Sequence, residues 1–91
     1  MASYDNFVER RAGHSGGYPV LKGHNISVRV IVEKSRQVED FAGLCAALPQ
    51  CSPEELRAAL DYYRDHADLV DEDIERNRQA WDKVVAGAWP G

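Results

Sequence analysis

The sequence predicts a small, mainly α-helical domain that begins with a short β-hairpin or β arm and continues as three or four helices. Apolar residues between positions 38 and 85 recur at intervals of three and four, which is the spacing of one helix face. Two of the helices are joined by about three residues, a connection typical of a helix-turn-helix. At 91 residues, the chain has room for one domain with one modest core.

The first 27 residues contain glycine and short apolar pieces rather than a helical pattern. Residues 1–17 end in a glycine-rich run, Gly13-His14-Ser15-Gly16-Gly17, and predict a flexible N-terminal arm. Residues 18–27 place a turn around Gly23 between two apolar pieces, which predicts a β arm. A lone hairpin is marginally stable, so this one needs the surface of a helix in its own chain or of a second copy.

The segment 26–36 fits two structures. Ile26, Val28, Val30 and Val32 alternate as they would in a strand. Val28 and Val32 also follow helical spacing, and Ser27 can cap a helix there. The residues alone leave both possibilities open.

Two helices follow with clearer patterns. The first spans 38–48, with Val38, Phe41 and Leu48 on its apolar face. The second begins at a capping box, in which Ser52 and Glu55 satisfy each other's backbone amides and Pro53 occupies the first helical position. This second helix is predicted over 53–67.

The last predicted helix spans 71–85. Asp71, Glu72 and Asp73 would lie in its first turn, where carboxylates complement the positive end of the helix dipole. Residues 86–91 form a C-terminal tail, and the single helical domain covers 18–85.

Charge is distributed unevenly along the chain. The net charge is -4; residues 1–48 hold six basic and five acidic groups, and residues 49–91 hold five basic and ten acidic groups. The first half therefore suits an anionic partner and the second half a cationic one. No export signal or membrane-spanning run is present, and Cys45 and Cys51 read as free thiols, so a cytoplasmic location is expected.

Chemistry-bearing motifs are scarce. No nucleophile motif, zinc-ligand spacing or phosphate-binding glycine loop occurs, so the chain is predicted not to be an enzyme and to need no cofactor. The histidines offer one alternative, a haem or metal site that uses His66 with His14 or His24.

About residues 14–75 resemble the family catalogued as domain of unknown function 433. The positions that carry the resemblance are Pro19, Gly23, Ile26, Val28, Pro49, Ala59, Leu60 and Tyr62. The family's Thr-Arg pair is replaced here by His24-Asn25, and its second proline by Ser27. The resemblance implies a homeodomain-like helical fold with an N-terminal β element, and a helix from about Val28, over 28–36.

The resemblance also implies a function, because many members look like VapB-type antitoxins. These are small dimers that bind their own promoter and neutralise a PIN-like nuclease, and some other members are associated with haem through histidine. The leading hypothesis is therefore a homodimeric antitoxin-like regulator with a PIN-like nuclease toxin as its partner and operator DNA as a further one. A small accessory subunit of a larger assembly is another alternative.

These hypotheses assign residues to two surfaces. Basic and amide side chains of the first half are the DNA-binding candidates: Lys22, His24, Asn25 and Arg29. Acidic and aromatic side chains of the second half are the partner-binding candidates: Asp71, Glu72, Asp73, Trp81 and Trp89. The helix that follows the capping box begins with two glutamates, which repel phosphate at the end that would enter a DNA groove.

Overall fold

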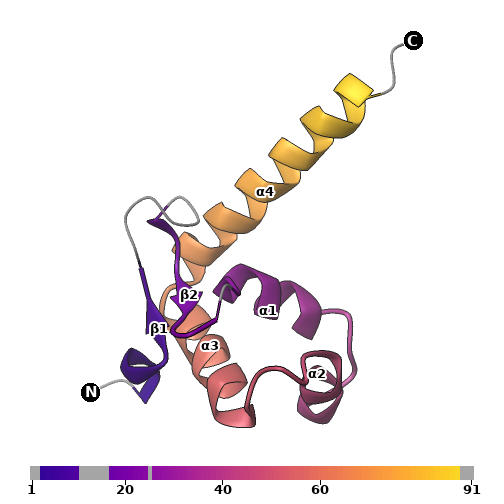
Figure 1. Cartoon of the computed structure of the whole chain (residues 1–91). Helices are drawn as coiled ribbons and strands as arrows, with labels where there is room; N and C mark the ends of the chain where they lie inside the picture. The colour runs from indigo at the N-terminus through magenta and orange to yellow at the C-terminus, as the bar shows by residue number, and fades with distance from the viewer. Residues whose placement is uncertain (1–2, 11–16, 25, 89–91) are drawn as a thin grey trace.

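Four α-helices and a two-stranded antiparallel sheet make up the described part of the chain, residues 3–10, 17–24 and 26–88 of the computed structural model (Figure 1). Side chains are described as far as Lys83. The mainly helical fold class predicted from sequence is confirmed. The elements in order are η1 (Ser3–Asn6), β1 (Val8–Glu9), β2 (Val20–Leu21), α1 (Val28–Ser35), α2 (Phe41–Ala47), α3 (Pro53–Asp65) and α4 (Ala67–Ala88).

Residues 4–9 pack into the core, which corrects the prediction of a flexible arm for this part of residues 1–17. Strand β1 pairs with β2, with Val8 opposite Leu21 and Glu9 opposite Val20. Tyr4 and Val8 are both buried. Their burial removes apolar surface from water, and this stabilises the segment against the helices. Residues 11–16, which hold most of the predicted glycine-rich loop, lie outside the described residues.

The predicted β arm over 18–27 contains strand β2 and a tight turn. Val20 forms a single antiparallel bridge with Ser27, and Gly23 takes a φ of 78°, which favours glycine. Val20 and Leu21 are fully buried against this same chain. The apolar side chains of the arm are therefore already buried within this chain, and they leave little apolar surface for a second copy to bury.

Helix α1 resolves the ambiguous segment in favour of a helix. Val28, Ile31 and Val32 are all buried on one face, whereas Val30 is only half-buried. A strand would have put Val28, Val30 and Val32 on the same side. The burial of Val28, Ile31 and Val32 against the core therefore selects the helix over the strand.

Helices α2 and α3 are shorter than predicted but begin for clear reasons. Asp40 caps α2 by accepting a hydrogen bond from the Gly43 amide at 2.9 Å. The capping box of α3 forms as predicted: the Ser52 hydroxyl accepts from the Glu55 amide at 3.1 Å, and the Glu55 carboxylate accepts from the Ser52 amide at 2.8 Å. The connection between the two helices, residues 48–52, is longer than the predicted three residues.

Helix α4 begins at Ala67, four residues before the predicted start at Asp71. The His66 amide donates a hydrogen bond to the Tyr62 carbonyl at 2.9 Å, at the end of α3. The His66 carbonyl accepts a hydrogen bond from the Val70 amide at 3.2 Å, at the start of α4. The early start allows Val70 to be fully buried. Asp68, rather than the Asp71–Asp73 run, therefore lies in the first turn and complements the helix dipole.

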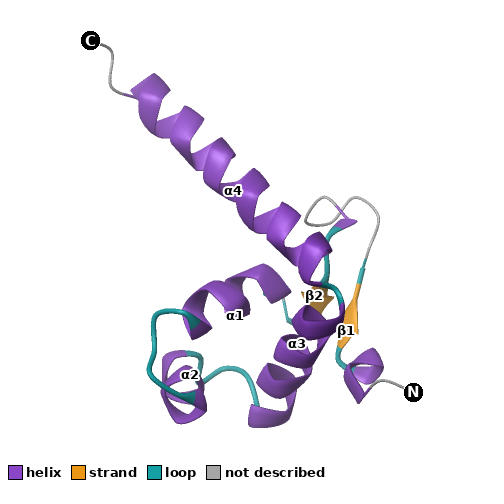
Figure 2. Cartoon of the chain, turned by 180° about the vertical axis from the view of Figure 1, so that it is seen from behind, coloured by secondary structure: helices purple, strands orange, loops and turns teal. Residues whose placement is uncertain are grey.

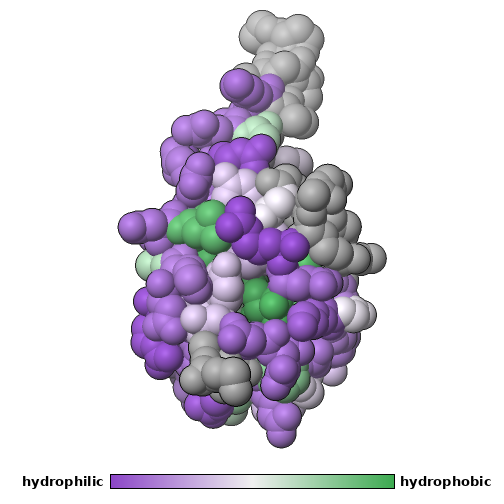
Figure 3. Space-filling view, turned by 90° about the vertical axis from the view of Figure 1, so that its left-hand side faces the viewer, coloured by the Kyte–Doolittle hydropathy of each residue, from purple (hydrophilic) through white to green (hydrophobic). Residues whose placement is uncertain are grey.

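The molecule is elongated because α4 extends beyond the rest of the chain. Its principal dimensions are 50 × 31 × 22 Å. Helices α1, α2 and α3 surround the core with the strands beside α3, and α4 projects away from them (Figures 1 and 2). We call the described residues up to Ile74 the head. One side of the surface is mainly hydrophilic, with apolar residues in small patches (Figure 3).

Candidate functional site

The most exposed large apolar side chain described is Trp81 on α4, which is 65% exposed. Every described residue from Glu75 to Lys83 is exposed, so the burial of α4 against the core ends at Ile74. Arg76 still reaches back to the head, where its guanidinium lies 5.0 Å from the centre of the Tyr18 ring. Ile74, one heptad before Trp81, is half-buried and packs against the core. The apolar stripe that anchors α4 to the head thus continues onto its projecting part. Trp89, the other predicted aromatic anchor, lies outside the described residues.

The predicted acidic patch at Asp71, Glu72 and Asp73 divides into exposed and buried groups. Asp71 accepts a hydrogen bond from the Tyr63 hydroxyl at 2.9 Å and lies 3.7 Å from Arg36. Glu72 is exposed. Asp73 is only 8% exposed and faces inward, so its assignment to a partner surface is corrected.

Asp73 lies 3.7 Å from the Arg29 guanidinium, which also bonds the Glu33 carboxylate at 3.0 Å. Burial raises the pKa of the Asp73 carboxyl, and the positive charge of Arg29 offsets part of that increase. Arg29 is therefore held between two carboxylates. Its role in the structure is to neutralise buried charge at the α1–α4 contact.

The DNA-binding candidates do not form one basic surface. Lys22 is exposed, and its ammonium donates to the Asp5 carbonyl at 3.2 Å. His24 lies 2.7 Å from the Glu55 carboxylate, which belongs to the α3 capping box. Asn25 lies outside the described residues. Of the three candidates that the structure describes, His24 and Arg29 contact carboxylates, whereas Lys22 contacts a backbone carbonyl.

The histidines considered as haem ligands are separated by the length of α3. His24 contacts the first turn of α3, and His66 follows its last residue. Thirteen residues of helix span about 20 Å, which is too far for two ligands of one iron. His66 instead stacks on Tyr62, with ring centres 4.3 Å apart, and lies 3.3 Å from the Tyr4 hydroxyl. His14 lies outside the described residues.

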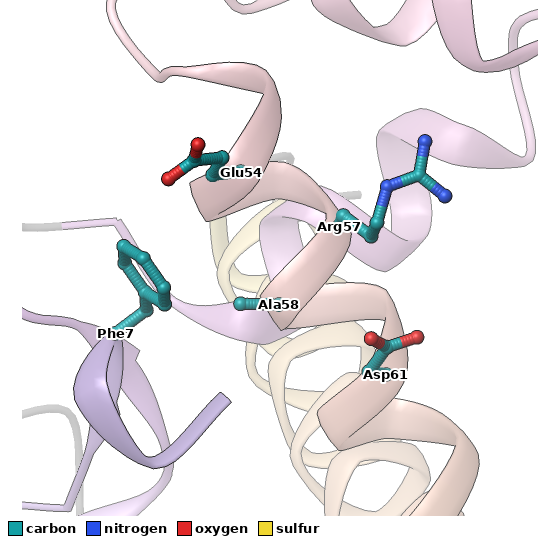
Figure 4. A pocket seen from close by; sticks show the side chains of 5 residues that line it. All are labelled: Phe7, Glu54, Arg57, Ala58 and Asp61. Atoms are coloured by element: carbon teal, nitrogen blue, oxygen red, sulfur yellow. The ribbon is translucent and has the colours of Figure 1, made fainter. Parts of the chain in front are cut away.

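A groove between the N-terminal segment and α3 was not predicted. Phe7, from the turn after η1, faces Ala58 on α3 across a cavity of about 250 Å³ (Figure 4). Glu54, Arg57 and Asp61 form the rest of its lining. These three share one face of α3 and can be grouped from sequence. Phe7 is far from them in sequence and gives no local signal.

The described residues show little reactive chemistry. Burial raises the pKa of the Cys51 thiol, which disfavours the thiolate, and Cys45 is also a free thiol. Among the described side chains, no group of three or more potential ligands is placed to hold a metal ion. Within the same residues, no helix is long and apolar enough to cross a membrane.

Comparison with known proteins gives a family and a fold. Residues 8–63 match the model of the family described as "Protein of unknown function (DUF433)". The chain belongs to the DUF433 family. A crystal structure of a DUF433 member protein from Anabaena variabilis ATCC 29413 is similar, with a TM-score of 0.68 and 27% sequence identity over 78% of this chain and 70% of that chain. No curated protein matches.

The extent of the family match divides this DUF433 protein into two parts. The matched residues run from β1 nearly to the end of α3 and include Ala58 and the capping box. Helix α4 follows the matched residues, so Trp81 lies on an element outside them. The family description names no activity.

Proposed function

We propose that this DUF433 protein is a non-catalytic, antitoxin-like regulator that binds a PIN-like nuclease through the projecting part of α4. The observation that carries the proposal is the exposure of α4 from Glu75 to Lys83 with Trp81 among these residues. A single helix gains little stability without tertiary packing. A partner that covers the Trp81 side would supply that packing, and tryptophan is enriched among residues that dominate binding energy.

The charges on α4 support contact through the apolar stripe. Arg78 bonds Glu75 at 2.6 Å and lies 3.4 Å from Asp82, so these three charges are paired within the helix. Such pairs one turn apart stabilise a free helix. Ile74 and Trp81 are seven residues apart and therefore lie on nearly the same face. Because these charges are balanced within α4, the helix can present the side that carries Trp81 to a partner.

The position of α4 after the family match also supports the proposal. A fold shared over residues 8–63, followed by a helix outside the family match, would allow different members to bind different partners. Within the head, at the start of α4, Asp68 and Glu72 are exposed acidic groups that would complement a basic cleft. A nuclease cleft that binds nucleic acid is basic for the same physical reason.

Homodimerisation, a cytoplasmic location and binding of operator DNA complete the proposal. The buried β arm gives self-association no support, so a dimer would need another surface, such as α4. For DNA, Lys22 is the contact that the geometry favours, because Arg29 and His24 already face carboxylates.

The test is co-expression of the tagged protein with the nuclease encoded beside its own gene, followed by size-exclusion chromatography. A stable complex is expected. Trp81→Ala should weaken it at least about 30-fold, as for a residue that dominates an interface. Lys83→Ala, an exposed change on the same helix, is the matched control and should stay within about threefold. A failure to bind any such nuclease, or equal binding by Trp81→Ala, would contradict the proposal.

A further inference from the structure

The groove between Phe7 and α3 has the size of one side chain. Its volume of about 250 Å³ lies below the range of about 300–1,000 Å³ in which pockets hold drug-sized ligands. Phe7 and Ala58 face each other and form an apolar interior, and Glu54 stands at the edge on the side of Phe7 (Figure 4). The groove therefore suits an elongated side chain with an apolar stem.

The rim of the groove is negatively charged. Glu54 and Asp61 are seven residues apart on one face of α3, which corresponds to a rise of about 10 Å. Arg57 lies between them in sequence, but its guanidinium lies over the Phe41 ring at 4.6 Å and points away from Phe7 (Figure 4). Its positive charge is thus directed out of the groove.

Glu54 is the acidic group most available for a ligand. Its side chain is exposed, and within the described part of the chain it forms neither a hydrogen bond nor an ion pair. Asp61, by contrast, lies 3.5 Å from Arg64. An approaching cation would meet one free carboxylate and one whose charge is partly compensated.

We propose that this groove binds a lysine or arginine side chain of a protein partner. The aliphatic stem would lie against Phe7 and Ala58, as long basic side chains do on apolar surface, while the cation meets the Glu54 carboxylate. The Phe7 ring adds attraction for a cation over its face. Nucleic acid does not fit this groove, because both rim carboxylates repel phosphate. The inference rests on the proposed function, and it specifies the chemistry of the partner.

The direct test is an NMR titration of the full chain, labelled with nitrogen-15, with the peptide acetyl-Gly-Arg-Gly-amide. Saturable shifts of the Phe7 and Ala58 amides are expected, and acetyl-Gly-Glu-Gly-amide should cause none. The double variant Glu54→Gln/Asp61→Asn should raise the dissociation constant of the arginine peptide at least about threefold. Glu39→Gln, at an exposed acidic residue that does not line the groove, is the matched control and should leave the dissociation constant unchanged.

Three results would overturn the inference: shifts that do not saturate, equal shifts with the glutamate peptide, or an unchanged dissociation constant in the double variant. The wild-type amide spectrum, retained in the double variant, shows that both proteins are folded.

The nuclease complex separates this inference from the proposed function. If the complex forms and depends on Trp81 but is insensitive to the double variant, the groove does not bind that partner. The inference then fails while the proposed function stands. If no nuclease binds, the proposed function fails, and the partner role of the groove fails with it.

Discussion

Tyr4 donates a hydrogen bond from its hydroxyl to the Asp65 carboxylate at 3.0 Å, across 61 positions of sequence. Its ring also meets the Tyr62 ring edge-on, with ring centres 5.1 Å apart. The first described residues are thereby attached to the last turn of α3, directly before α4 begins. One contact thus holds the N-terminal segment to the junction from which the projecting helix emerges.

Replacing Tyr4 should loosen the N-terminal segment. Tyr4→Phe keeps the ring contact but removes the hydrogen bond, so we expect a lower melting temperature and faster amide exchange in β1. Tyr4→Ala should lower the melting temperature further, because it also exposes the buried surface around Tyr62. Equal melting temperatures for both variants and the wild type would show that the contact is not stabilising.

The capping box should account for a measurable part of the stability of the head. Ser52→Ala removes the acceptor of the Glu55 amide and should cost about 1 kcal/mol. For a domain of this size, that loss lowers the melting temperature by about 4–8 °C. Ser52→Thr retains a capping hydroxyl and serves as the control in the same calorimetric measurement. A Ser52→Ala variant as stable as Ser52→Thr would contradict the prediction.

Acid should weaken the head through Glu55. The Ser52 amide, followed by His24, lowers the pKa of the Glu55 carboxyl in the folded protein. A group whose folded pKa is lowered stabilises the fold above its unfolded pKa, and that contribution is lost as pH falls through the folded value. Wild-type stability, measured by urea unfolding, should therefore fall below about pH 4.

Glu55→Gln is the variant that isolates this effect. Glutamine can still accept the Ser52 amide but does not titrate, so the variant should lose less stability than the wild type between about pH 5 and 3. Identical pH profiles for the two proteins would rule out Glu55 as the source.

Arg29 and Asp73 should respond unequally to substitution. Arg29→Met removes the larger of the two positive charges that act on the buried Asp73 carboxylate, leaving Arg76, and should cost about 1–3 kcal/mol at neutral pH. Asp73→Asn should cost less, because Arg29 keeps Glu33 as a partner at 3.0 Å. Because burial raises the pKa of Asp73, its ionisation weakens the fold as pH rises through that value. Urea unfolding at pH 7 checks the order, and an equal loss in both variants would contradict it.

Binding of operator DNA should depend on Lys22 if it occurs at the β2–α1 side. Lys22→Ala should weaken binding to the DNA upstream of the gene and reduce the slope of log affinity against log salt by about 0.9, the value for one phosphate contact. Glu54→Ala, which removes a repelling charge, should not weaken binding. A mobility-shift series at several salt concentrations measures both, and equal losses from the two changes would refute this contact.

Local signals predicted the start of α3 well. The start of α3 at Pro53 follows from Ser52 and Glu55, whose interaction spans three residues and needs no other part of the molecule. The start of α4 was misplaced, because an acidic run is a weak signal compared with the burial of Val70. Asp73 was wrongly assigned to the surface because a carboxylate on a helix is usually solvated, whereas here it is buried.

The site was only partly predictable. Trp81 stands out in sequence as a large aromatic residue on an amphipathic helix, and the structure places it on the exposed part of α4. The groove required Phe7 to meet Ala58, and no spacing rule links residues so far apart. The pairing of Lys22, His24 and Arg29 with carbonyl or carboxylate groups likewise depends on which elements become neighbours.

The sequence by itself determined the family, the helical class and the capped start of α3, because each depends on residue types at short spacing. The tertiary structure alone decided that residues 3–10 join the core and that α4 projects, and it confirmed the helix at 28–35 that the family resemblance implied. Those outcomes depend on which apolar faces can be buried together. The free energy of such burial depends on the apolar area that segments far apart in sequence remove from water together, and this area cannot be calculated from local spacing.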